Sequence, residues 1–266
     1  MKSKLSILSI IQIIVTSAIS QDFEVSPVKL LFNAEPGSTQ VKNLVVKNHS
    51  SQSQSYIVSV GDFTINNSGN REFAPAGSNK RSVSNWLTIT PTFFELPPNQ
   101  EQQIAVSIQP PIDEFGSRWG VLYIRPTVEK KSFQADKTLS AGMTLSPQIV
   151  VEVYQTALSS SAALSVKIDQ FREIESDSQT ERKFSAIVTN NSDIIVECRA
   201  FLILSDIKTG EEKIFPPSTF ATFPKTSQRI ILSLPRDYPK GTYALAAVLD
   251  YGNTQTLEGA QIIIEF

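Results

Sequence analysis

The sequence has one cysteine and one histidine in 266 residues. A chain with a single cysteine forms no internal disulfide, so its folded part must be stable from its apolar core alone. Zinc sites need several His or Cys ligands, and the sequence has only one of each, so the usual zinc ligand sets are excluded. His49 lies in the polar turn sequence Asn48-His49-Ser50, where a solvent-facing side chain is a better interpretation than a triad base. We therefore expect no metal, no cofactor and no enzymatic activity.

Charge of one sign is also lacking. The 24 basic and 26 acidic residues leave a net charge of −2. Basic residues form no patch or stripe beyond Lys80-Arg81 and Lys130-Lys131, so a nucleic-acid partner is not expected. No glycine-rich phosphate loop or dinucleotide fingerprint is present. Acidic pairs of the kind glycosidases use do occur, but Asp113-Glu114 and Glu211-Glu212 lie in turn-like sequence, which favours solvated turns.

Long apolar runs are absent except at the N-terminus. Lys2 and Lys4 precede the run Leu5–Val15, and Ala18-Ile19-Ser20 places small residues where a signal peptidase reads them. This pattern predicts a signal peptide over residues 1–20, cleaved before Gln21. The run is short for a membrane span, and no second run follows, so we expect an exported chain with no span after cleavage.

The sequence is rich in short β-type segments separated by Pro, Gly, Asn and Ser. Such segments occupy residues 41–46, 56–60, 104–108, 121–124 and 149–154, and again 184–188, 196–204, 229–234, 243–249 and 260–266. Helical periodicity is almost absent. The pattern predicts an all-β protein with two tandem immunoglobulin-like β-sandwich domains.

A weak internal repeat supports two domains. Val46–Ser50 matches Val188–Ser192, and Leu96-Pro97 matches Phe223-Pro224 in the same order. We expect sandwiches over residues 22–157 and 160–266. The extra length of the first half lies in residues 61–85, which predicts a long loop or an additional hairpin.

Alternation within the segments predicts the core. Cys198 alternates with apolar residues and is interpreted as a buried thiol. The expected core residues are Val45, Tyr56, Val58, Trp86, Leu87, Ile104, Val106, Val121 and Tyr123 in the first domain, and Ile187, Phe201, Ile203, Ile231, Leu245 and Val248 in the second.

The chain resembles the PapD-like periplasmic chaperones of pilus assembly and related bacterial envelope proteins. The segments that carry the resemblance are Phe23–Pro27, Pro36-Gly37, Val45–Asn48, Trp86 and Leu96–Pro98, then Val188–Asn190, Gly241–Tyr243 and Leu249–Gly252. The resemblance implies a protein partner, an exported subunit, that is held by a donated strand. It also implies two basic residues that grip the subunit's terminal carboxylate.

Lys29 falls where the resemblance places one of these basic residues, although an exposed edge-strand lysine would look the same. The second is expected in the strand that ends the first domain, but Met143–Tyr154 contains no Lys or Arg. Arg118 or Arg125 could replace it from an adjacent strand.

The partner-binding surface is predicted on Lys29 and on the strand 141–153, with the charged segment 127–140 before it. Ala141, Met143 and Leu145 alternate with small or polar residues, which is typical of a strand with one apolar face. The alternative is that Met143 and Leu145 pack into the core.

A second function also fits the sequence, namely an envelope or surface module that binds a partner protein or cell-wall glycan. WxL-interacting proteins resemble the chain in the Pro-Gly turn, the Asn-Ser turn and the Trp-containing segment. They usually carry a membrane anchor after the second domain, whereas this sequence ends at Phe266.

Overall fold

The structure is a computed structural model that describes residues 22–127, 147–157, 163–253 and 257–266. The predicted signal peptide, residues 1–20, lies outside the described residues. Within these ranges the chain forms eighteen β-strands and one 3₁₀ turn, η1 (Ser84–Trp86). The all-β prediction is confirmed. None of the helical structure in the described part of the chain is long and apolar enough to cross a membrane.

The first ten strands form one sandwich of two sheets. One sheet has the order β1 (Phe23–Ser26), β3 (Gln40–Asn48), β8 (Glu101–Ile108) and β6 (Leu87–Thr90). The other has the order β2 (Lys29–Phe32), β10 (Ile149–Gln155), β9 (Arg118–Pro126), β4 (Gln54–Ile65) and β5 (Arg71–Pro75), and β7 (Phe93–Leu96) also pairs with β4. The chain changes sheet between β1 and β2, so β2 lies parallel to β10.

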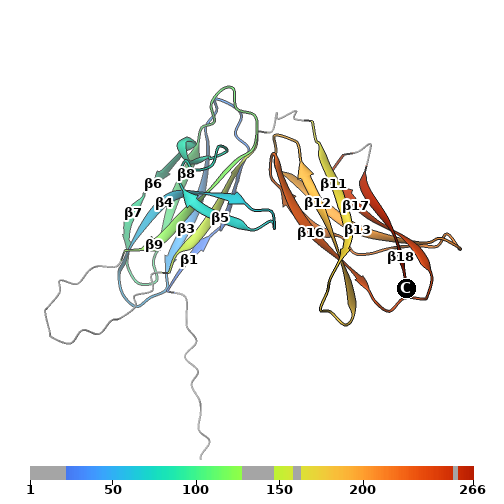
Figure 1. Ribbon diagram of the computed structural model, residues 1–266. Helices are drawn as coiled ribbons and strands as arrows, with labels where there is room; N and C mark the ends of the chain where they lie inside the picture. Colours follow the sequence, from blue (N-terminus) through green and yellow to red (C-terminus); the bar gives the residue numbers. More distant parts are fainter. Residues whose placement is uncertain (1–21, 128–146, 158–162, 254–256) are drawn as a thin grey trace, which may run out of the picture.

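The last eight strands form the second sandwich (Figure 1). One sheet has the order β11 (Val166–Ile174), β12 (Glu181–Asn190) and β16 (Thr226–Pro235). The other has the order β14 (Glu212–Ile214), β13 (Val196–Asp206), β17 (Thr242–Asp250) and β18 (Glu258–Glu265), and β15 (Ser218–Thr222) also pairs with β13. The two-sandwich prediction is confirmed, while the boundaries at residues 157 and 160 remain predictions.

Each sandwich has its own apolar core. The core predictions are confirmed for Tyr56, Val58, Ile104, Val106, Val121 and Leu245. Cys198 is fully buried, and burial raises the pKa of its thiol to about 11. This agrees with the interpretation as a core thiol, because a thiol with a raised pKa is largely protonated at neutral pH.

Several core predictions are wrong by one residue. Val45, Ile187, Phe201, Ile203 and Val248 are half-buried, each between two buried residues. Trp86 and Leu87 are also half-buried but pack against the first core, and Tyr123 packs against a separate apolar cluster. Ile231 is 56% exposed, and its neighbours Ile230 and Leu232 are the buried residues. Where a strand contains a run of consecutive apolar residues, the period of two does not indicate which face points inward.

The internal repeat corresponds to a buried asparagine in each sandwich. The Asn48 side-chain amide donates to the carbonyls of Gln52 and Leu96. The Asn190 amide donates in the same way to Ile194 and Thr222. Each asparagine therefore ties the end of its strand to the turn that follows it and to a second, distant turn.

The repeat is shifted by one residue from the predicted match. Asn99 and Lys225 both have a positive φ, 59° and 58°, and donate their N–H to the carbonyls of the two buried asparagines. Thr222, not Phe223, is therefore the counterpart of Leu96. Phe223 takes the place of Pro97.

The extra length of the first half is a hairpin. Strands β4 and β5 pair from Gly61–Pro75 to Ile65–Arg71, and the turn between them is held by Asn66. The Asn66 Oδ1 accepts the N–H groups of Ser68 and Asn70. Figure 1 shows this hairpin extending from the first sandwich toward the second.

Candidate functional site

The surface where the sandwiches meet is aromatic. Phe223 of the second sandwich is 4% exposed and packs against Trp119, Phe63 and Tyr154 of the first, with ring centroids 4.9, 5.9 and 6.3 Å away. The Trp119 indole N–H donates to the Phe63 carbonyl. Aromatic rings in such tilted and edge-on contacts stabilise an interface beyond the area they bury.

Polar contacts surround this aromatic cluster. Arg81 donates to the Asp193 carboxylate at 2.6 Å. The Ser117 N–H donates to the Asp193 carbonyl, and the Ser117 hydroxyl accepts the N–H of Ile195. The side chain of Arg81 holds the pKa of Asp193 below its ordinary value of 3.8. An aromatic cluster, an ion pair and hydrogen bonds thus hold the two sandwiches together.

A charged cluster lies beside this junction, on the outer face of β2, β10 and β5. Arg71 contacts Glu152 with 2.8 Å between Nε and Oε1, and its Nη2 donates to the Tyr154 hydroxyl. The Tyr154 hydroxyl donates to Glu152. Burial, together with the neighbouring Glu152, raises the pKa of Tyr154 to about 12, so its hydroxyl stays protonated and able to donate.

The predicted site residue Lys29 belongs to this cluster. It is exposed, it pairs in register with Glu152, and its Nζ lies 5.0 Å from the centre of the Tyr154 ring. A lysine over an aromatic face is stabilised by the ring. Among the described residues Lys29 forms no ion pair, whereas Arg71 is paired with Glu152. Lys29 is therefore the cation of the cluster that is available to an anionic group.

Neither Arg118 nor Arg125, the alternatives for the second basic residue, shares a contact with Lys29 among the described residues. Arg118 shares a strand face with the core residues Leu122 and Ile124 and is ion-paired with Glu114. Arg125 pairs in register with Ile57, at the far end of β9. Arg71 is the second base near Lys29. Sequence reasoning missed it because the segment around it was expected to be a loop or hairpin of unknown position.

The first half of β10 has an open edge. Strand β2 pairs only with Glu152–Gln155, so Ile149–Val151 has β9 on one side and no strand on the other among the described residues. The Glu152 N–H donates to Val28. Because alternate residues point their backbone groups to opposite sides of a strand, Val150 points its N–H and C=O to the open side.

The other predicted binding residues, Ala141, Met143 and Leu145, lie outside the described residues. The described strand covers Ile149–Gln155, two residues further than the expected end at Val153. It is also not an edge strand along its whole length, because β2 covers its second half. The short parallel strand β2 gives no signal in the sequence that distinguishes it from the strand before it.

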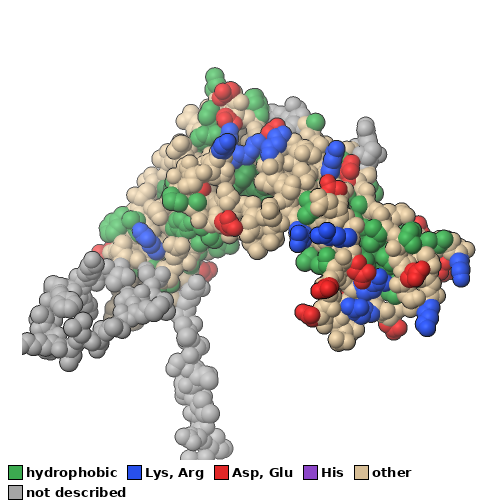
Figure 2. Space-filling model, viewed as in Figure 1, with side chains coloured by type: hydrophobic (Ala, Val, Ile, Leu, Met, Phe, Trp, Pro, Cys, Tyr) green, Lys and Arg blue, Asp and Glu red, His purple; other side chains and the backbone are tan. Residues whose placement is uncertain are grey.

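The outer face of the same sheet carries the aromatic side chains of Tyr123, which is half-buried and lies opposite Val150, and of Phe73, which is exposed on β5. Phe73 is 53% exposed and lies 6.3 Å from Tyr123, ring to ring. The Tyr123 ring covers Gly61, where an added Cβ would be 2.4 Å from a ring carbon. Figure 2 shows few charged side chains on the visible face of the first sandwich and more, of both signs, on the second.

The described residues contain no group of three or more His, Cys, Asp and Glu side chains that could hold a metal ion. His49 contacts Glu24 at 3.0 Å in the turn after β3, as a solvent-facing turn histidine would. The geometry of the site, an open strand edge beside a cation and aromatic rings, is suited to binding a polypeptide.

No family model and no curated protein matches the sequence. Among solved structures, the chain is similar to one from a chaperone–tip adhesin complex of CFA/I fimbriae, with a TM-score of 0.49 and 10% identity over 91% of this chain and 98% of the other. It is also similar to the class 5 fimbriae chaperone CfaA (TM-score 0.47, 10% identity, 91% and 98%) and to the E. coli chaperone DraB (0.42, 14%, 90% and 98%). The likeness is one of fold.

Proposed function

We propose that this protein is an exported, non-enzymatic binding protein that assists the assembly of surface subunits by donating a strand. The half-open edge of β10 is the observation that carries the proposal. A strand edge with unpaired N–H and C=O groups binds an extended segment of another chain through backbone hydrogen bonds. The Val150 backbone groups supply such an edge within the first sandwich.

Ala141, Met143 and Leu145 precede this edge in the sequence and are proposed to continue it. Their alternation would place one apolar side chain after another against the partner, as strand pairing with side-chain pockets requires. Tyr123 lies opposite Val150 on the neighbouring strand, and its ring, with Phe73 beyond it, offers further apolar contact.

Lys29 is proposed to bind a carboxylate of the partner. It is the cation of the cluster without an ion pair among the described residues, and the Tyr154 ring supports it. A contact between exposed charges weakens as salt rises, because the screening length falls to about 8 Å at physiological ionic strength. Partner binding should therefore contain one salt-sensitive contribution, from Lys29, and one from strand pairing that is almost independent of salt.

The test is capture of a partner from envelope extracts by the tagged protein, with identification by mass spectrometry. We expect Met143→Asp and Leu145→Asp to remain folded and to capture less, and the double variant least. Lys29→Ala should capture less only at low salt, while Lys167→Ala, an exposed lysine of the second sandwich, should behave as wild type. Unfolded aspartate variants would identify Met143 and Leu145 as core residues. Unchanged capture by folded variants would place the binding edge elsewhere.

The second candidate, a stable envelope interaction module, is favoured by one feature of the cluster. Glu152 already neutralises Arg71, so the site has a single unpaired cation where the resemblance implies two. A gene for an outer-membrane usher or pilin-like subunits next to this one would favour the assembly function. Cell-surface or adhesin genes without an usher would favour the module.

A further inference from the structure

Strand β16 is a long edge strand of the second sandwich. Its ten residues pair with β12 over their whole length, from Glu181–Pro235 to Asn190–Thr226. No strand in the described part of the chain pairs with its other side. A long unpaired edge presents a row of backbone donors and acceptors, which natural proteins usually cover or blunt.

One contact shows which backbone groups face the open side. The Arg229 N–H donates to the carbonyl of Asn67, in the turn of the β4–β5 hairpin, at 2.8 Å. Since N–H and C=O directions alternate along a strand, the backbone groups of Ile231 and Ser233 point to the same side. No hydrogen bond to them from the described residues is present on that side. Pro235, which has no N–H, ends the edge.

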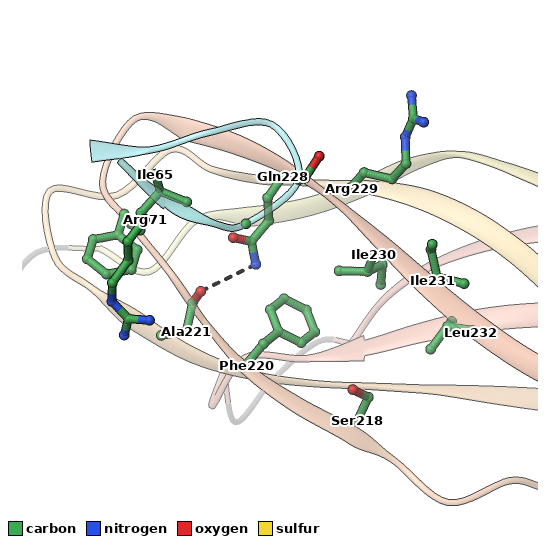
Figure 3. Close-up of a pocket in the computed structure, with 13 residues that line it drawn as sticks. Ile65, Arg71, Ser218, Phe220, Ala221, Gln228, Arg229, Ile230, Ile231 and Leu232 are labelled. Carbon is green, nitrogen blue, oxygen red and sulfur yellow. Dashed lines mark hydrogen bonds between the residues drawn. The ribbon is translucent and has the colours of Figure 1, made fainter. Parts of the chain in front are cut away.

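A pocket of about 310 Å³ borders this edge, between the hairpin of the first sandwich and β15 and β16 of the second. Its apolar lining includes Phe220, Ile230 and Leu232, which lie where the two sheets of the second sandwich separate. In Figure 3 the Phe220 ring and the Gln228 amide point into the pocket. The Gln228 amide donates a hydrogen bond to the Ala221 carbonyl, which fixes the orientation of this side chain in the pocket wall. An added strand would direct its inward side chains here.

The outer side of the edge carries one unpaired cation among the described residues, Arg229. It is exposed and points away from the pocket in Figure 3. Lys183, at the other end, is ion-paired with Glu181 and also donates to the Ser233 hydroxyl, so its charge is neutralised within the sandwich. The stretch from Arg229 to Ser233 spans about 14 Å at roughly 3.4 Å per residue. The edge therefore fits a short extended segment with an acidic side chain on its outer face near Arg229.

We propose that the open edge of β16 is a second peptide-binding site, which takes an extended, acidic segment of a partner protein as an added strand. The Asn67 carbonyl already occupies the first position of that strand and sets its register. An apolar side chain of the segment fills the pocket, and an acidic one pairs with Arg229. The site is formed by β15 and β16 of the second sandwich and by the hairpin of the first. It uses neither β10 nor Lys29, so it does not rest on the function proposed above.

The probe for the test is the blocked peptide acetyl-Glu-Val-Thr-Val-Glu-amide, and the control is the same peptide with lysine at both ends. Binding to the full chain is followed by NMR of the backbone amides. We expect the Ile231 and Ser233 amides to exchange rapidly with solvent in the free protein and to become protected as the acidic peptide binds. Saturating peptide that leaves both amides unprotected would overturn the proposal.

The matched variants are Ile231→Pro and Ile231→Thr. Both remove the exposed isoleucine, but only proline removes the N–H that faces the open side, and it breaks no bond to β12. We expect Ile231→Pro to weaken peptide binding at least about tenfold, and Ile231→Thr to bind within about threefold of wild type. Equal binding by the two variants, both folded by circular dichroism, would refute strand addition.

Arg229→Glu keeps the proposal testable if the proline variant does not fold. It should reverse the preference, so that the lysine peptide binds better than the glutamate peptide. An unchanged preference would exclude the assigned register. A second copy of this chain is the competing occupant. If sedimentation velocity shows a dimer that Ile231→Thr keeps and Ile231→Pro loses, the occupant of the edge is a second copy of this chain and not a peptide.

Discussion

Phe223 is the side chain of the second sandwich that packs into the aromatic cluster of the first. Its replacement by alanine therefore tests what holds the two sandwiches together. The change removes a ring that is 4% exposed and that packs against Trp119, Phe63 and Tyr154. Truncation of a buried phenylalanine to alanine costs about 3–5 kcal/mol. That loss should fall on the junction, because Phe223 belongs to the aromatic cluster there and not to either sandwich core.

The contacts that remain are weaker. The Arg81–Asp193 pair, whose side chains are 20% and 56% exposed, contributes about 0–1 kcal/mol. The hydrogen bonds through Ser117 contribute about 1 kcal/mol each. Losing Phe223 therefore removes more than any of these contacts supplies, and we expect the two sandwiches of the variant to unfold separately.

The assay uses Trp119 as its reporter, in a Trp86→Phe background so that one tryptophan remains. In urea, the wild type should show one unfolding transition and Phe223→Ala two. In the variant, the Trp119 emission should shift to the red before either sandwich unfolds. Phe215→Ala, which removes a partly buried ring of the second sandwich, is the control and should keep one transition. A single transition within about 0.5 kcal/mol of wild type for Phe223→Ala would refute the reasoning.

Three further predictions follow from other features. Asn190→Ala should lower the free energy of unfolding by about 2–4 kcal/mol, because it leaves buried carbonyls without donors, whereas Asn43→Ala on the exposed face of β3 should change it by less than about 0.5 kcal/mol in urea melts. Cys198 should not react with a thiol reagent at pH about 8 until the protein unfolds, since burial raises its pKa; rapid stoichiometric labelling of the native protein would contradict its burial. The pKa of Asp193 is lowered in the folded state by Arg81, so its contribution is complete above the ordinary value of 3.8 and is lost as pH falls below it. Asp193→Asn should therefore lose less stability than wild type on acidification, and an equal loss would show that the pair does not contribute.

Much of the fold is visible in the sequence, because turn residues and β-branched segments determine where strands begin and end. The equivalence of Asn48 and Asn190 is also visible in the sequence, because each lies in one of the two matching segments, Val46–Ser50 and Val188–Ser192. Alternation indicated the inward face of only part of the second sandwich. In β16 the run Ile230–Leu232 is apolar throughout, so only packing against the opposite sheet decides that Ile231 points outward.

The candidate site could be predicted only in part. The position of Lys29 followed from resemblance, but its partners come from β10 and from a hairpin distant in sequence. Glu152 and Arg71 are 81 residues apart, and no local pattern indicates that they meet. The parallel pairing of β2 with β10 likewise depends on the change of sheet after β1, which is a property of the whole sandwich.

The β4–β5 hairpin and Phe223 have a consequence for how the chain can be divided. Each half covers apolar surface of the other: Trp119 and Phe63 on one side, Phe223 on the other. Cutting the connection between Ala157 and Ala163 would remove the covalent link and leave these contacts in place. Two separately expressed halves should therefore be poorly soluble alone and should reassemble when mixed, which would make the protein a ready-made split reporter whose signal depends on a single aromatic ring.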